Sequence, residues 1–205
     1  MSELSPGQRQ RIEAAVSAAE KRTSAEFAVV VARSADDYAT FPLLWAGFLT
    51  LLTAGGIAAV TPGLSAGMSF AIQAGVFITV AAALHLSDLR TRLVPAALKR
   101  DYAARLARLQ FAALINERTA DDAGLLLFVS LAEKHVEILA DNGITARVPQ
   151  TEFQEIIDQF IQQVRTEKIE AGLTGAIEAC ALLLARHFPP RIAEPDEIPN
   201  QIIEI

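Results

Sequence analysis

FPLLWAGFLTLLTAGGIAAV, residues 41–60, is a run of twenty residues without a charged side chain. It belongs to a longer window, residues 38–87, that holds fifty consecutive residues without Asp, Glu, Lys or Arg. The stretch TPGLSAG, residues 61–67, interrupts this window with one proline and two glycines, which favour a turn. Two apolar segments remain, 41–60 and about 68–86. Each approaches the roughly 20 residues that a helix needs to cross a bilayer.

A pair of buried core helices in a soluble protein is the alternative interpretation of these segments. Core helices in a domain of this size need a polar stripe that faces water, and neither segment has one. A cleaved signal peptide fits less well, because no basic region directly precedes residue 41 and a second apolar run follows. The pattern therefore favours a transmembrane helical hairpin over residues 38–87.

The distribution of charge predicts which way this hairpin points. The net charge is −1 over residues 1–37, +4 over 88–108 and −9 over 109–205, in a chain of net charge −6. Basic flanks of a span stay on the cytoplasmic side, so the basic segment after the second span predicts that both termini are cytoplasmic. Only the uncharged turn would cross the bilayer. The single cysteine, Cys180, agrees with a reducing compartment.

The remaining residues predict alternating helices and strands. This interpretation rests on three signals. Ser5 is a plausible helix N-cap, residues 25–32 are a β-branched run typical of a strand, and the short AEK connection between residues 131 and 135 indicates a β-hairpin. The predicted helices are 6–21, 94–119, 151–166 and 172–188, and the predicted strands are 25–32, 125–131 and 135–140. The last segment, 189–205, has four prolines and no periodicity, which predicts an extended tail with NQIIEI as a docking segment.

The first predicted strand lies before the hairpin and the other strands lie after it. A single strand cannot satisfy its backbone groups, so the two halves must meet in one sheet, with Val30 expected beside Leu127. We therefore expect one α/β domain interrupted by a hairpin. Its parts are residues 1–37 (first helix and strand), 38–87 (hairpin), 88–188 (remainder of the domain) and 189–205 (tail).

The segments AGLLLFVSLAEKHVEILADNGI, residues 123–144, and TSAEFAVVVARS, residues 23–34, resemble the TPM domain family. The resemblance is in particular to its membrane-inserted bacterial branch, which has two spans inside the domain. The resemblance implies a small Rossmann-like sheet sandwiched by helices. Together with the charge distribution it predicts the bacterial inner membrane as the location, with the α/β domain in the cytoplasm. The family includes a thylakoid protein that is associated with photosystem repair and described as an acid phosphatase. Other bacterial members look like accessory proteins of the envelope.

Acidic residues at the expected strand ends are the candidate metal ligands. An oxygen-rich cluster of this kind could hold Mg²⁺ or Ca²⁺, although no cofactor is certain. The candidates are Glu26, Asp121, Asp122 and Asp141. Helix capping and turn formation explain the three aspartates equally well.

Motifs of other reaction classes are absent from the sequence. It contains no phosphate-binding loop, no dinucleotide-binding glycine pattern, no esterase serine motif and no zinc-protease motif. Basic residues directly after a span favour anionic lipid headgroups over nucleic acid as a partner. These residues are Arg90, Arg92, Lys99 and Arg100.

Two functions from different classes remain open. The first is a non-catalytic accessory or assembly factor that docks on an inner-membrane protein complex or a related envelope protein. Glycines in this region permit close helix approach. The candidate contacts with the bilayer or a partner are Trp45 and the glycines Gly47, Gly55, Gly56, Gly67 and Gly75. The second function is a divalent-metal-dependent phosphatase at the membrane surface, and the sequence leaves open whether the chain is an enzyme.

Overall fold

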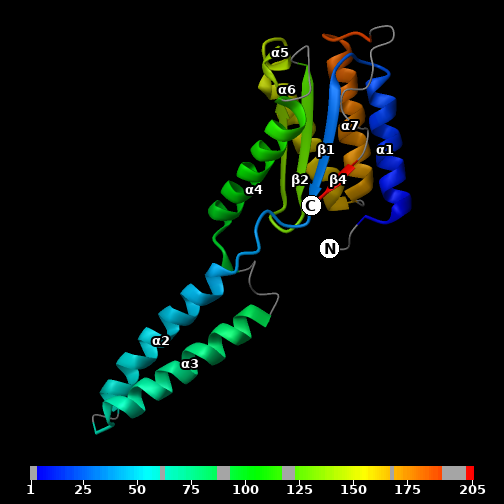
Figure 1. Cartoon of the computed structure of the whole chain (residues 1–205). Coiled ribbons are helices and arrows are strands. Elements are labelled where there is room, and N and C mark those ends of the chain that lie inside the picture. Colours follow the sequence, from blue (N-terminus) through cyan, green and yellow to red (C-terminus); the bar gives the residue numbers. More distant parts are fainter. Residues whose placement is uncertain (1–3, 61–62, 87–92, 117–122, 167–168, 191–201) are drawn as a thin grey trace. The chain divides into compact units, whose positions relative to one another are not determined.

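The computed structural model of the chain describes residues 4–60, 63–86, 93–116, 123–166, 169–190 and 202–205. The chain divides into two compact units, one of Met1–Ala35 with Arg100–Ile205 and one of Asp36–Lys99 (Figure 1). The elements are α1 (Pro6–Glu20), β1 (Glu26–Ala32), α2 (Thr40–Val60), α3 (Ala66–Leu86), α4 (Ala96–Phe111), the π-helix η2 (Ala112–Asn116), β2 (Gly124–Ser130), β3 (His135–Ala140), α5 (Asn142–Thr145), α6 (Gln150–Thr166), α7 (Ile169–Ala185) and β4 (Ile202–Glu204).

The first unit is built on a four-stranded sheet of order β3-β2-β1-β4. β1 pairs in parallel with both β2 and β4, whereas β2 and β3 form an antiparallel hairpin. β2 is buried along its whole length, and β1 is buried except at its first residue. Strands covered on both faces read as continuous apolar runs, which explains why these two segments lack alternation.

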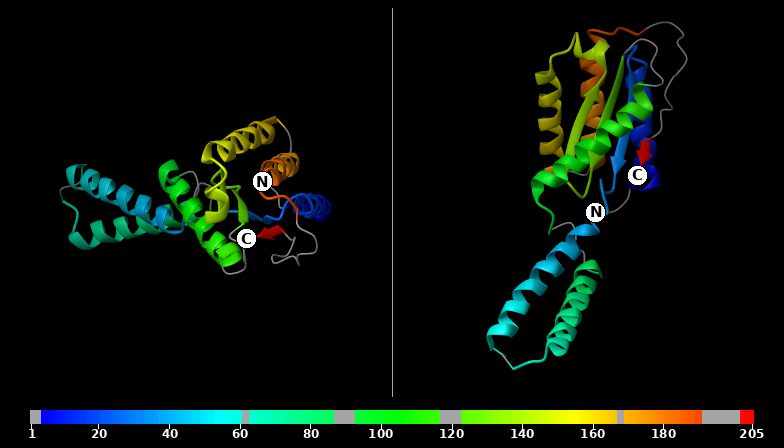
Figure 2. Two further views of the ribbon diagram at one scale, coloured as in Figure 1. Left: turned by 90° about the horizontal axis from the view of Figure 1, so that it is seen from above. Right: turned by 60° about the vertical axis from the view of Figure 1, so that its left-hand side comes forward.

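Helices cover both faces of this sheet (Figure 2). On one face, Val29 and Leu127 pack in a core that includes residues of α1, α6 and α7. On the other face, Val30 and Phe128 pack with Ala103 of α4. The result is an α/β sandwich, as expected from the sequence.

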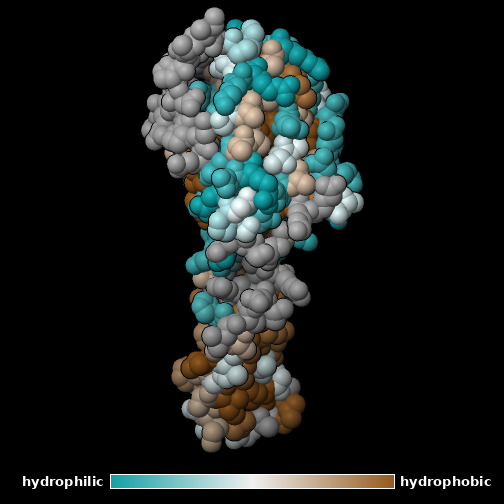
Figure 3. Space-filling view, turned by 90° about the vertical axis from the view of Figure 1, so that its right-hand side faces the viewer, coloured by the Kyte–Doolittle hydropathy of each residue, from teal (hydrophilic) through white to brown (hydrophobic). Residues whose placement is uncertain are grey.

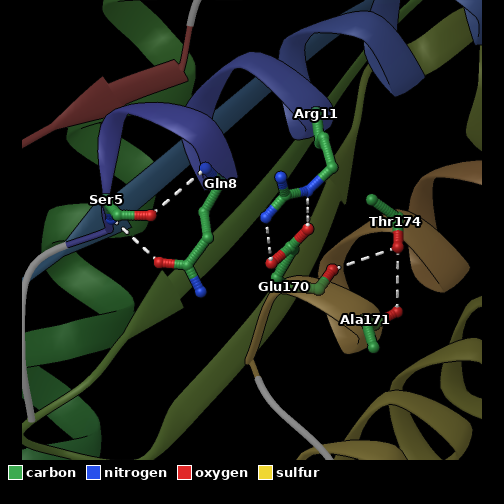
Figure 4. Close-up of polar contacts among 6 residues, drawn as sticks. All are labelled: Ser5, Gln8, Arg11, Glu170, Ala171 and Thr174. Atoms are coloured by element: carbon green, nitrogen blue, oxygen red, sulfur yellow. Dashed lines mark hydrogen bonds and ion pairs between the residues drawn. The ribbon is translucent and has the colours of Figure 1, made fainter.

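Polar contacts cap α1 and join it to α7. Ser5 and Gln8 form a capping box at the start of α1, in which the Ser5 backbone amide donates to Gln8 Oε1 at 2.8 Å and the Gln8 backbone amide donates to Ser5 Oγ at 3.4 Å. The Arg11 guanidinium donates to both carboxylate oxygens of Glu170 at the start of α7 (Figure 4). This carboxylate raises the pKa of Arg11, so the guanidinium stays charged.

The second unit contains α2 and α3, which pack against each other. Both are 21 residues long. Their apolar windows, Thr40–Ile57 and Ala66–His85, are long and apolar enough to cross a membrane by length and composition. Only 11% of the first window and 0% of the second is buried, and Figure 3 shows apolar side chains over the visible face of this unit.

Three details differ from the sequence-based expectations. Val30 pairs with Phe128, and Leu127 pairs with Val29, so the expected Val30–Leu127 pairing was wrong by one residue. The short helix α5 lies at residues 142–145, outside the predicted helices and strands. The end of the tail is not merely extended, because β4 joins the sheet as its edge strand.

Candidate functional site

Two of the predicted metal ligands lie at one end of the sheet. Glu26 is the first residue of β1 and pairs with Gly124, the first residue of β2. Asp141 directly follows β3, and its amide donates to the Gly124 carbonyl at 3.0 Å. The backbones of Glu26 and Asp141 therefore flank Gly124 on opposite sides.

Asp141 has a structural role at this end. Its Oδ1 accepts a hydrogen bond from the Ile144 amide at 3.2 Å, which caps α5. Its Oδ2 accepts one from the Gly124 amide at 2.5 Å. The side chain is nearly buried, at 8% exposure. One carboxylate thus joins the beginning of β2 to the beginning of α5.

The metal site remains a prediction. Asp121 and Asp122 lie outside the described residues. Among the residues that the structure describes, no group of three or more His, Cys, Asp or Glu side chains is arranged to hold a metal ion. Glu26 and Asp141 alone supply too few protein oxygens for the six to eight ligands that Ca²⁺ takes.

A second polar cluster lies at the opposite end, where β1 and β2 finish. Ser130 is the last residue of β2 and is fully buried. Its hydroxyl hydrogen-bonds one carboxylate oxygen of Glu133, and the Ser34 hydroxyl donates to the other oxygen at 3.0 Å. Lys134 follows in the left-handed region, with φ at 52°. This cluster ties the segment after β1 to the β2–β3 turn.

A cleft of about 510 Å³ adjoins this turn. Its walls are mainly apolar side chains of β2, β3 and α6, and its polar lining residues include Lys134, His135 and Arg165. His135 Nε2 lies 3.1 Å from Glu137 Oε2. The volume is within the range of small-molecule sites. Ser130 also lines the cleft; the residue is buried, and its hydroxyl donates to Glu133.

The pairing of Ser130 with Glu133 is a feature that the sequence analysis does not predict. The tight turn of the β-hairpin brings a residue three positions later within hydrogen-bonding distance of Ser130. The "SLAE" spacing before the second strand of the hairpin was the available signal.

The predicted contact residues of the second unit face open space or a shallow groove. A Cβ added at Gly47, Gly55, Gly56, Gly67 or Gly75 would meet nothing within 4 Å. These glycines are therefore not required for the packing of α2 on α3. Trp45 is half-exposed, donates to the Leu93 carbonyl at 3.4 Å and lines a groove of about 340 Å³ with Phe41 and Phe48.

The predicted headgroup-binding residues are only partly described. Lys99 and Arg100 lie in the first turns of α4. Arg90 and Arg92 lie outside the described residues. Interaction of these four side chains with lipid therefore stays a prediction.

Cys180 is a packing residue. It is fully buried in α7, and desolvation raises the pKa of its thiol to about 12. The thiol is therefore protonated at neutral pH, as is usual for a buried cysteine in an apolar core.

Comparison with known proteins agrees with this architecture. A search of curated protein sequences found no match. The chain is similar to a solved structure, the NMR structure of the BA42 protein from the psychrophilic bacterium Bizionia argentinensis. The TM-score is 0.61 and the identity 19%, over 99% of this chain and 96% of that one, which shows a shared fold. Residues 86–182 match the model of the TPM domain. β1, which pairs with β2 in the sheet, lies outside the matched range.

Proposed function

We propose that this chain is a membrane-anchored interaction module, an accessory or assembly factor that docks on a protein complex of the bacterial inner membrane. The exposed apolar surface of α2 and α3 carries the proposal. A 21-residue helix is about 31 Å long, which matches a hydrocarbon core of about 30 Å. The two helices pack against each other, and the low buried share of their apolar windows leaves most of this apolar surface exposed.

The proposed topology follows from charge. Residues 61–65 between α2 and α3 carry no charge, so moving them across the bilayer costs little. The basic segment 88–108 would stay on the cytoplasmic side. Because β1 precedes the hairpin and β2 follows it, a shared sheet requires both ends of the hairpin to emerge on one side. Both termini and the α/β sandwich are then cytoplasmic.

Three features support the docking role: the described residues hold no metal cluster, the glycines of α2 and α3 leave open space, and the distal segment is acidic. Ser130 is also buried. The glycines of α2 and α3 leave space where the backbone of another membrane helix could approach closely. The segment 109–205 carries a net charge of −9, which favours a basic partner surface.

Reporter fusions test the topology. An alkaline phosphatase fusion at Ser65 should be active because this enzyme needs the periplasm, whereas a green fluorescent protein fusion after Ile205 should fluoresce in the cytoplasm. A cytoplasmic Ser65 would refute the anchoring. Extraction of the native chain in mild detergent, followed by mass analysis, tests the docking. Recovery only as a free monomer would refute it.

A metal-dependent phosphatase is the second candidate, and the alignment of Glu26, Gly124 and Asp141 at one end of the sheet favours it. The test is hydrolysis of a generic phosphate ester by the purified chain, with and without Mg²⁺ or Ca²⁺. Asp121→Asn, Asp122→Asn and Asp141→Asn should lower the rate, whereas Asp158→Asn on the exposed face of α6 serves as the matched control. A rate that does not respond to these three substitutions would exclude this function.

A further inference from the structure

The cleft beside the β2–β3 turn has an apolar interior. Its volume is about 510 Å³, and its lining residues come from the β2–β3 hairpin, the second half of α6 and the start of α7. Phe160 is buried in the core on this face of the sheet, and Val136 and Val164 pack against the same core. The interior of the cleft therefore continues this core, and an apolar group that fills it would lose its contact with water.

Two exposed cations also line the cleft. Lys134 belongs to the hairpin turn, and Arg165 belongs to the last turn of α6. Within the described part of the chain, neither side chain forms an ion pair with a carboxylate. The described lining residues include no Asp or Glu. An anion could therefore approach both cations without displacing a carboxylate that already neutralises them.

His135 limits the negative charge that the cleft can accept. Its Nε2 lies 3.1 Å from Glu137 Oε2, and both side chains are mostly buried, at 20% and 25% exposure. Glu137 balances any positive charge on this imidazole, so the net positive charge at the cleft comes from Lys134 and Arg165. Because Glu137 also repels a further anion, a single negative charge fits the cleft better than a phosphate dianion does.

The backbone of Lys134 gives independent support for a role of its side chain. Its φ is 52°, in the left-handed region that glycine adopts at the lowest cost. Backbone strain of this kind is concentrated at ligand sites, where a particular side chain is needed in spite of its cost. A lysine at this position therefore favours a function for the ammonium group.

We propose that this cleft is a binding site for an amphipathic carboxylate with a medium-length apolar chain. The chain packs against Phe160 and Val164, and the carboxylate contacts Lys134 and Arg165. A guanidinium binds a carboxylate through two parallel hydrogen bonds, and an ammonium adds a point charge. All described lining residues belong to the first unit, so the site is separate from the proposed membrane hairpin and goes beyond the docking role.

Titration of the full chain with octanoate, in an uncharged detergent, tests the site by nuclear magnetic resonance. The isoleucine methyl groups and histidine rings carry isotope labels, and free ligand is measured in protein-free micelles. We expect saturable shifts at Ile161, Ile169 and His135, with a Kd below about 1 mM. Ile12 is buried in α1 and is not a lining residue, so its methyl signal should stay unchanged.

Three further ligands separate the contributions of charge and chain. Octanamide has the size of octanoate but no charge, and it should bind about two- to fivefold more weakly. Acetate has the carboxylate without the long chain, and it should bind at least about tenfold more weakly. Octyl phosphate should bind no more tightly than octanoate, and tighter binding would overturn the assignment of a carboxylate.

Two variants test the cations. Lys134→Gln and Arg165→Gln should each weaken octanoate about two- to fivefold, as for exposed ion pairs, and should leave octanamide unaffected. Arg186→Gln is the matched control, because Arg186 is exposed just after α7 and does not line the cleft. It removes the same charge and should leave the affinity for octanoate unchanged.

The outcomes distinguish the site from the proposed function. No saturable shift at Ile161, Ile169 and His135 would overturn the binding site. Equal binding of octanoate and octanamide, or equal effects of Arg165→Gln and Arg186→Gln, would overturn recognition of the carboxylate by these cations. None of these results depends on membrane topology, which the Ser65 reporter tests separately.

Discussion

Replacement of Gly172 by alanine should weaken the packing of α7 on α6. A Cβ at this position would lie 2.6 Å from Cγ2 of Val164 and 3.2 Å from Cε2 of Phe160. Val164 is β-branched and stiff, and Phe160 is buried in the core, so neither side chain can swing aside freely. The two helices would have to separate locally.

The magnitude follows from two opposing terms. Overpacking of a core contact costs about 1–3 kcal/mol. Alanine in a helix interior is favoured over glycine by about 1 kcal/mol. The free energy of unfolding of Gly172→Ala should therefore fall by up to about 2 kcal/mol relative to the unaltered chain.

Gly175 in the same helix provides a matched control. Its Cβ would meet Oε1 of Gln163 at 2.7 Å, which is the far end of a flexible and partly exposed side chain. Gln163 can rotate away, so Gly175→Ala should keep the helical gain and raise the free energy of unfolding by up to about 1 kcal/mol. The two variants should thus differ by about 1–3 kcal/mol.

Urea unfolding in mild detergent, followed by far-ultraviolet circular dichroism, measures this difference. Both variants should share one m-value, because neither changes the surface that unfolding exposes. A Gly172→Ala chain that equals or exceeds Gly175→Ala in stability would refute the close contact between α6 and α7.

Three further predictions concern single residues. Cys180 should resist iodoacetamide until the chain unfolds. Folding raises the pKa of its thiol from 9.0 to about 12, so above pH 9 the unfolded state loses the proton before the folded state does. The free energy of unfolding should therefore fall above pH 9 by up to about 1.4 kcal/mol per pH unit, which urea unfolding at several pH values measures. Lys134→Gly should raise the free energy of unfolding by up to about 1 kcal/mol, which a higher thermal midpoint would report, since glycine relieves the left-handed conformation at φ 52° but adds entropy to the unfolded chain. Glu133→Gln should lower the free energy of unfolding by about 1–3 kcal/mol, because the charge-assisted hydrogen bonds to Ser130 and Ser34 are lost. Ser34→Ala removes only one of these bonds and should cost less. Equal stability of Glu133→Gln and the unaltered chain would show that these hydrogen bonds do not stabilise the turn.

Apolar patterning predicted the strands and their connection well. The continuous apolar run in β1 and the hairpin of β2 and β3 could be predicted because both are local patterns. The register between β1 and β2 could not be predicted in this way, because it joins segments that are distant in sequence. Placing the start of β2 at Leu125 rather than Gly124 accompanied the one-residue error, and side chains alternate between faces at each step.

Features that depend on tertiary contacts were the least predictable. β4 has three residues and no periodicity of its own, so only the exposed edge of β1 defines it as a strand. Asp141 was correctly seen as suited to a turn or a cap, but its bond to Gly124 crosses from one strand to another. The bonds from Ser34 and Ser130 to Glu133 likewise need two strand ends in place.

The interruption of the sheet by the second unit has a consequence for biosynthesis. Glu26 and its partner Gly124 are roughly 100 residues apart, so a ribosome that adds 5–20 residues per second completes β1 about 5–20 seconds before β2 emerges. During that interval the nascent chain presents an apolar strand with no mate, at the same time as α2 and α3 leave the exit tunnel. A chaperone, or prompt delivery of the helices to an insertion machinery, would be needed to keep this unpaired strand from aggregating. The other edge of β1 is paired later still, because β4 follows β2 in the sequence.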